Sequence, residues 1–329
     1  MDKSTSFRIV QPAPIALFVY ARADHTAKTL RALADNALAD QSDLFIFSDA
    51  PRSERERRAV EEVRRLIRQE MLFKSVTIIE RTENYGLAQN IIEGVSFLTE
   101  RYGRAIVIED DLVTSPCFLD FMNRALDRYA GDPAVWHING WTYPIAPSTE
   151  DMPFFTTIME CWGWATWRDR WEKYSNDPER YVGRWTKPQI ERFNVGGGYD
   201  YWLDIVRNMH GTMKTWAVFW YATIFENGGL CLSPAQSYVI NIGIDGSGAN
   251  SGSLNIYDRV QLNDRLPAEW PESAVADEQA WDRTRKFLLG QRAPLWRRAA
   301  ARMKWSLRRA SALLANGRAK RRPVAIPKP

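Results

Sequence analysis

The chain has 329 residues, with 44 Lys and Arg against 40 Asp and Glu, and a net charge of +4. Fifteen basic and no acidic residues fall in residues 283–329, which leaves residues 1–282 with a net charge of −11. The 45% hydrophobic content excludes wholesale disorder, and three widely spaced cysteines argue against a disulfide framework and favour a reducing cytoplasm.

The first half of the chain alternates apolar, β-rich runs with amphipathic segments. Buried strands are predicted at residues 15–20, 44–47, 76–79, 105–108 and 134–138. Apolar residues at helical spacing predict helices at residues 26–39, from Ser53 to about Met71, at 86–102 and at 118–129. Ser53 and Glu56 form a capping-box pattern, and Gly103 is expected to end the third helix. This order predicts an α/β fold with a mostly parallel sheet and helices on both faces.

Polar residues follow three of these strands. In open α/β sheets, ligands bind at the carboxyl ends of the strands, where Arg22, Asp49 and Asp111 are expected. Glu109-Asp110-Asp111 is the sharpest signal, because three adjacent carboxylates repel one another unless a cation neutralises them. With only three histidines, a zinc site is not favoured, whereas Mg²⁺ or Mn²⁺ prefers oxygen ligands and could share a diphosphate. A solvated acidic loop is the alternative.

The acidic triplet resembles the aspartate-rich motif of glycosyltransferases with the GT-A fold. Within that fold it looks most like the N-acetylglucosaminyltransferase I family and bacterial family 2-like sugar transferases. Four further segments match in the same order, and the resemblance covers roughly residues 14–250: Val19-Tyr20-Ala21-Arg22, Ser48-Asp49, Gly163-Trp164 and Gly198-Tyr199-Asp200-Tyr201-Trp202.

The resemblance implies a role for each matched position. Arg22 would meet the donor diphosphate, for which a bidentate guanidinium is suited, and Asp49 would contact a uracil. Glu109 and Asp110 would contact the donor, and Asp111 would bind the metal directly. Ordinary alternatives are a surface arginine for Arg22 and a turn aspartate for Asp49.

Asp200 matches the aspartate that serves as catalytic base in the family. An inverting transfer needs such a carboxylate to take the proton of the acceptor hydroxyl. The alternative is a helix N-cap, because Asp200 follows three glycines and precedes an apolar run. Asp204 is a second candidate, one helical turn later.

Tryptophan is concentrated in the second half. Ten of the 14 tryptophans lie between Trp136 and Trp220. Indole rings stack well on sugars, so an acceptor groove is predicted from Trp141, Trp162, Trp164 and Trp202. Core packing is the better expectation for most of the ten.

A glycine-rich loop at residues 243–252 is expected to close over the donor, or else to be a plain linker. In many bacterial relatives a histidine follows the Asp-Gly-Ser-Gly stretch two residues later, where this chain has Asn250. A histidine metal ligand is therefore not expected, and the metal is left on Asp111.

The basic tail is predicted to form an amphipathic helix at residues 294–316, followed by disorder. Such a helix fits an anionic membrane surface, and packing on the acidic body is the alternative. No nucleic-acid reader module accompanies it, so nucleic acid is not an expected partner. The longest apolar run, 15–21, is far below the ~20 residues of a membrane span, and no signal peptide is expected. A cytoplasmic enzyme is expected, with the tail as a peripheral contact to the inner face of the cytoplasmic membrane.

These features predict one GT-A domain at residues 14–255, with a nucleotide-sugar-binding half at 14–140 and an acceptor-binding half at 141–255. A connecting segment at 256–293 and the basic tail at 294–329 follow. The predicted function is metal-dependent, inverting transfer from a nucleotide-sugar, with a UDP-sugar favoured, to a hydroxyl of a surface glycan or lipid-linked saccharide. The alternatives are a catalytically silent carbohydrate-binding relative and a sugar nucleotidyltransferase. The latter needs a Gly-rich phosphate loop, which residues 20–25 lack.

Overall fold

The computed structural model describes residues 11–145, 151–245 and 260–291. The first four strands of the sheet are parallel, and their bounds are β1 Ile15–Val19, β2 Asp43–Ser48, β3 Ser75–Glu80 and β4 Arg104–Glu109. The chain from residue 135 to residue 233 adds β6 Val135–Asn139, β7 Phe154–Thr156, β8 Trp164–Trp167 and β9 Leu230–Ser233. Their order across the sheet is β3-β2-β1-β4-β8-β6-β9-β7. Strands β8 and β7 run against the other six, so the sheet is mostly parallel as predicted.

A small second sheet lies beside the acidic triplet. It pairs β5, Leu112–Thr114, with β10, Val239–Asn241, in antiparallel fashion. Because β5 begins directly after Asp111, this pairing brings the segment that follows β10 to the end of β4. The backbone N–H of Ile242 donates to the Asp111 carbonyl at 2.8 Å, which continues the contact.

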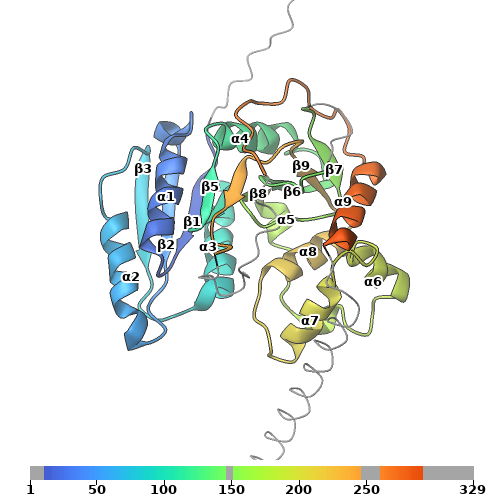
Figure 1. The fold of residues 1–329 in the computed structure, drawn as a ribbon, viewed down its shortest axis with the longest axis horizontal. Coiled ribbons are helices and arrows are strands. Elements are labelled where there is room, and N and C mark those ends of the chain that lie inside the picture. Colours follow the sequence, from blue (N-terminus) through green and yellow to red (C-terminus); the bar gives the residue numbers. More distant parts are fainter. Residues whose placement is uncertain (1–10, 146–150, 246–259, 292–329) are drawn as a thin grey trace, which may run out of the picture.

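Helices connect and cover the strands (Figure 1). In the first half they are α1 Ala23–Ala34, α2 Glu54–Ile67, α3 Gly86–Tyr102 and α4 Phe118–Arg128, with a short 3-10 turn η1 at Ala39–Gln41. The second half contains α5 Arg168–Trp171, η2 Pro178–Arg180, α6 Lys187–Phe193, α7 Tyr201–Met209, α8 Ala217–Glu226 and α9 Glu278–Gly290. Figure 1 shows α2 and α9 at opposite ends of the molecule.

The central strand β1 divides the core into two layers. Ile15, Leu17 and Val19 pack with apolar residues of α1, α2 and α4, whereas Ala16 and Phe18 pack with those of α3 and α8. Successive side chains of a strand point to opposite faces, so a strand buried on both faces needs this continuous apolar run. The predicted α/β fold, with helices on both faces of the sheet, is therefore confirmed.

Two local predictions were wrong in detail. The first helix begins at Ala23 and ends at Ala34, before the predicted end at residue 39, where Asn36 bonds back to the Ala32 carbonyl. Ser53 precedes α2, but its side chain makes no capping hydrogen bond. The carboxylate of Glu56 instead accepts a hydrogen bond from the Tyr20 hydroxyl at 2.9 Å, so a tertiary contact replaces the expected capping box.

The described part of the connecting segment packs against the body. Ala276 forms a bridge with Phe155 of β7, and Leu288 of α9 belongs to a buried cluster with Trp141 and Tyr143. Residues 260–291 therefore contribute to the fold. The predicted tail helix at 294–316 lies outside the described residues. Within the described ranges, no helix is long and apolar enough to cross a membrane, and all three cysteines are free.

Candidate active site

The carboxyl ends of β1 and β4 bring Arg22 against the acidic triplet. The Arg22 Nη2 donates to Asp111 Oδ2 at 2.9 Å and also bonds Asp110 Oδ1. Its other terminal nitrogen, Nη1, is buried and has no hydrogen-bond partner among the described residues. Sequence reasoning placed these three side chains at one edge of the sheet, and the structure brings them into contact.

Asp110 is held from several sides. It is 4% exposed, its Oδ2 accepts from the Tyr20 N–H at 3.3 Å, and its carbonyl accepts from the Thr29 hydroxyl at 2.9 Å. Burial raises the pKa of Asp110, and Arg22 opposes that shift. In the structure Asp110 fixes Arg22, and Asp111, with a side chain 14% exposed, is the more accessible carboxylate.

Glu109 adds to an excess of negative charge at this edge. Burial, followed by the carboxylates of Asp111 and Asp110, raises the pKa of Glu109 to about 8, against the effect of Arg22. One guanidinium thus faces three carboxyl groups. Such a site favours a bound cation, because desolvated like charges are costly together.

The donor set at this edge fits a hard divalent cation that is shared with a ligand. Within the described residues, no three His, Cys, Asp or Glu side chains lie close enough together to hold a metal. Mg²⁺ sites commonly use one or two carboxylates and complete the shell with phosphate oxygens and water. Asp111 can supply such a carboxylate, and the unpartnered Arg22 Nη1 is a donor suited to a phosphate oxygen.

Gly243 covers this group of side chains. A Cβ at this position would lie 2.1 Å from Asp111 Oδ2 and 2.9 Å from Arg22 Nη1, so the backbone approaches as closely as only glycine allows. Nearby, His25 of α1 lies 3.2 Å from the Asp245 carboxylate. The predicted glycine-rich loop therefore begins directly over Arg22 and Asp111, and residues 246–252 lie outside the described residues.

His25 was not among the predicted site residues. It lies three positions after Arg22, in the first turn of the helix that follows β1. Residues spaced by three share a helix face, so this spacing was the available signal.

Asp49 has a structural role that the sequence did not reveal. It is 5% exposed, and its two oxygens accept four hydrogen bonds, from the backbone N–H groups of Ala50, Tyr85 and Gly86 and from the Asn84 amide, at 2.8–3.0 Å. A carboxylate has about four acceptor positions. All are used here, at the N-terminus of α3, so Asp49 has no lone pair left for a uracil in this structure.

Asp200 occupies the N-cap of α7. It accepts from the Leu203 N–H at 3.3 Å and from the Asn194 amide at 3.2 Å. Asp204, the second candidate, is 8% exposed and accepts from the Tyr199 hydroxyl at 3.2 Å. The capping alternative for Asp200 is thus present in the structure, and its role as a base stays a prediction.

The four predicted acceptor tryptophans fall into two groups. Trp164 is fully buried and stacks on Trp216 with ring centroids 5.1 Å apart, and Trp141 is 2% exposed. Neither presents a ring face to a sugar, because both are packed inside the core. Trp162 and Trp202 are half-buried and remain candidates.

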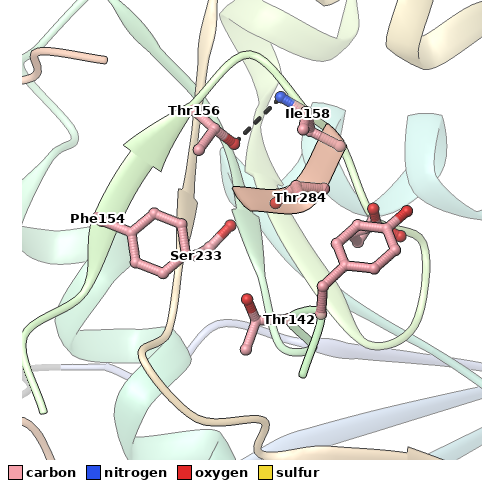
Figure 2. A pocket seen from close by; sticks show the side chains of 8 residues that line it. Thr142, Phe154, Thr156, Ile158, Ser233 and Thr284 are labelled. Atoms are coloured by element: carbon pink, nitrogen blue, oxygen red, sulfur yellow. Dashed lines mark hydrogen bonds between the residues drawn. The ribbon is translucent and has the colours of Figure 1, made fainter. Parts of the chain in front are cut away.

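Glu160 was missed altogether. It lies just before Cys161 and lines a small cavity with Thr142, Thr156, Ser233 and Thr284, which Figure 2 shows around a common space. Burial raises the pKa of Glu160 to about 8. The available signal was a single carboxylate inside an otherwise uncharged run, residues 152–167.

No family model matches the chain, and no curated protein matches it. Among solved structures, the chain is similar to a mannosyltransferase from Pyrobaculum calidifontis in complex with GDP-Man and Mn²⁺, at 12% identity and a TM-score of 0.37, over 65% of this chain and 70% of that one. It is also similar to S. aureus TarS 1–349, at 11% identity and a TM-score of 0.33, over 48% of this chain and 47% of that one. The chain thus spans about half of that TarS chain. Likenesses this distant carry no argument about substrate or mechanism, so function rests on the site.

Proposed function

We propose that the protein is a glycosyltransferase that moves a sugar from a nucleotide-sugar to a saccharide hydroxyl. The observation that supports this most directly is the buried, unpartnered Nη1 of Arg22 beside Asp111 at the carboxyl edge of the sheet. A site that pairs an orphaned guanidinium nitrogen with accessible carboxylate oxygens suits a diphosphate together with a divalent cation. The ordered motifs at Arg22, Asp111 and Asp200 resemble those of GT-A enzymes and point to the same reaction.

In this proposal each residue has a defined task. Arg22 Nη1 donates to a donor phosphate oxygen, and Asp110 holds the guanidinium in place. Asp111 supplies a carboxylate oxygen to Mg²⁺ or Mn²⁺, and such an ion stabilises negative charge on a departing diphosphate. The motif nominates Asp200 as the base that takes the acceptor proton. A UDP-sugar donor and a surface-glycan or lipid-linked acceptor are the finer parts of the proposal.

Nucleotide binding and donor turnover test the reaction class. Calorimetry with UDP and with GDP, with and without Mn²⁺, should show metal-dependent binding that Asp111→Asn weakens strongly. A panel of UDP- and GDP-sugars should release nucleotide only with the metal present. Absence of both metal-dependent binding and metal-dependent release for every nucleotide would reject the proposal.

The general base has its own test. Asp200→Asn should keep nucleotide affinity within about twofold yet lose about 10²-fold or more in transfer, the usual contribution of general base catalysis. Asp204→Asn serves as the comparison. Near-normal turnover of the Asp200 variant would leave that residue with its capping role alone.

The basic tail is proposed to hold the enzyme at an anionic membrane surface. Residues 294–329 hold 11 Lys and Arg and no Asp or Glu, which supports this proposal, since each Lys or Arg near such a surface contributes about 1 kcal/mol. Removal of residues 294–329 should abolish co-sedimentation with vesicles that contain phosphatidylglycerol and leave donor hydrolysis unchanged. Equal sedimentation of the full and shortened chains would contradict the proposal.

A further inference from the structure

A small cavity lies at the carboxyl ends of β6 and β9, beneath α9. Glu160 lines it, together with side chains that mostly carry hydroxyl groups: Thr142, Tyr143, Thr156, Ser233 and Thr284, with Phe154 and Ile158 (Figure 2). Its volume of about 10 Å³ is enough for one water molecule or one hydroxyl group. A whole sugar ring does not fit. The small volume and the polar lining favour a single oxygen that can form hydrogen bonds.

Glu160 has unused hydrogen-bonding capacity in this cavity. Its Oε1 is buried and has no partner among the described residues. Burial is the main cause that raises the pKa of Glu160 to about 8, and a hydrogen bond from Tyr143 works against it. Buried polar atoms are almost always hydrogen-bonded, and an unpaired carboxyl oxygen in a cavity therefore indicates a missing partner.

The cavity neighbours the proposed active site through the segment that leads into β8. The charges of Glu109, Glu160 and Asp111 all add to burial in raising the pKa of the Cys161 thiol, so this cysteine lies within electrostatic reach of both acidic groups. Two residues later, a Cβ on Gly163 would lie 3.3 Å from Ile108, which directly precedes Glu109. The residues that follow Glu160 thus approach the end of β4.

The opposite side of the cavity is linked to the segment that contains Asp200. Tyr143 hydrogen-bonds both Glu160 and Tyr201, the residue after Asp200. Tyr199 on the other side of Asp200 hydrogen-bonds Asp204. The lining residues Glu160 and Tyr143 are therefore followed along the chain or contacted by residues near the acidic triplet and near the motif that nominates the base.

We propose that this cavity is a subsite for one hydroxyl group of the saccharide acceptor, bound by Glu160 Oε1. The inference rests on the proposed transferase function and adds to it a residue that positions the acceptor. The bound hydroxyl is not the attacking one, and Glu160 removes no proton in the transfer. A permanently bound water could form the same hydrogen bond with Glu160 Oε1, and the test below separates the water from the acceptor hydroxyl.

Glu160 can be followed by NMR, and its neighbours decide what its resonance reports. They are the tyrosines Tyr143, Tyr201 and Tyr221 and the thiols of Cys161 and Cys231. None of these is a carboxyl group, so the ¹³C carboxyl resonance of Glu160 in ¹³C-glutamate-labelled protein reports on its own surroundings. The resonance is assigned by its absence in Glu160→Gln.

The probe is a panel of methyl glycosides, added to the full chain with UDP and Mn²⁺. We expect one glycoside to shift the Glu160 resonance, and Glu160→Gln to weaken binding of that glycoside about tenfold or more. Its deoxy analogues should identify the hydroxyl that enters the cavity. Thr284→Val, which removes a lining hydroxyl but keeps the shape, should weaken the same glycoside. Nucleotide affinity should change less than about twofold in both variants.

A control variant and two contrary results complete the test. Glu172→Gln, at a side chain that is 58% exposed, should change no glycoside affinity. If every glycoside leaves the Glu160 resonance unmoved, or if both cavity variants bind glycosides normally, the cavity holds a structural water and the inference is overturned. Failure of the wild-type chain to bind any nucleotide with Mn²⁺ would instead reject the proposed function, which keeps the two failures distinct.

Discussion

Replacement of Asp49 by alanine should destabilise the fold without a matching loss of nucleotide binding. The change removes the acceptor of four hydrogen bonds and leaves three backbone N–H groups and the Asn84 amide without it. A hydrogen bond to a charged group contributes about 1.5–3 kcal/mol, but neighbouring bonds do not add fully. Water can enter and satisfy part of the site, so we expect the free energy of unfolding to fall by about 3–5 kcal/mol.

Urea denaturation and thermal unfolding measure this loss, and calorimetry with UDP and Mn²⁺ on the folded variant measures nucleotide affinity. Asp49→Asn retains one acceptor oxygen and should lose about half as much stability. Asp43→Ala is the matched control, because Asp43 starts β2, the strand that Asp49 follows, and its carboxylate bonds the exposed Lys74 and Ser75, so its loss should stay below about 1 kcal/mol.

The reasoning fails if Asp49→Ala unfolds at the wild-type urea concentration. It also fails if the variant is fully stable but binds UDP more than about tenfold more weakly than the wild type. That second result would restore the uracil contact that the sequence resemblance implies.

Three further predictions follow from the same geometry. Gly243→Ala should weaken Mn²⁺-dependent UDP binding in calorimetry and cost about 1–3 kcal/mol in urea unfolding, because its Cβ would lie 2.1 Å from Asp111 Oδ2; wild-type values for both would contradict the close approach. Trp164→Ala should cost about 3–5 kcal/mol in unfolding free energy, whereas Trp162→Ala should cost clearly less; equal losses would mean that burial does not separate them. Stability should fall as pH rises from 4.5 to 8, because the folded protein keeps the Glu160 proton up to about pH 8 while an unfolded glutamate releases it near 4.5, so the unfolded state binds fewer protons. Glu160→Gln should reduce the difference in urea midpoint between pH 5 and pH 8.5, and an unchanged difference would refute the assignment.

Local sequence patterns were sufficient for much of the first half. The prediction for α3 matches its observed bounds, Gly86–Tyr102, and Gly103 adopts the left-handed conformation that ends the helix, with φ of 77°. Helix periodicity and a glycine stop are local signals, so no distant contact had to be known. The meeting of Arg22 with Asp111 was also predictable, since both follow parallel strands at one sheet edge.

The sequence was less informative where distant residues decide the contacts. The partners of Asp49 include Asn84, Tyr85 and Gly86, which reach it only because β2 ends beside the start of α3. The same holds for Glu56, whose partner Tyr20 is 36 residues away. Trp164 is buried because β8 enters the sheet. The sequence alone does not distinguish a tryptophan in a core strand from one in a sugar-binding groove.

The place of β8 decides how the protein can be divided and recombined. This strand comes from the second half of the chain but lies between β4 and β6, which both belong to the first half. A fragment that ends at residue 140 would lack both neighbours of β6 and one neighbour of β4, and exposed strand edges promote aggregation. Exchanging the part after residue 140 between related chains would therefore have to replace a central strand of the main sheet. Under the proposed function, new acceptor specificities should be easier to engineer by single substitutions around Glu160 and Trp162 than by fusing halves of two proteins.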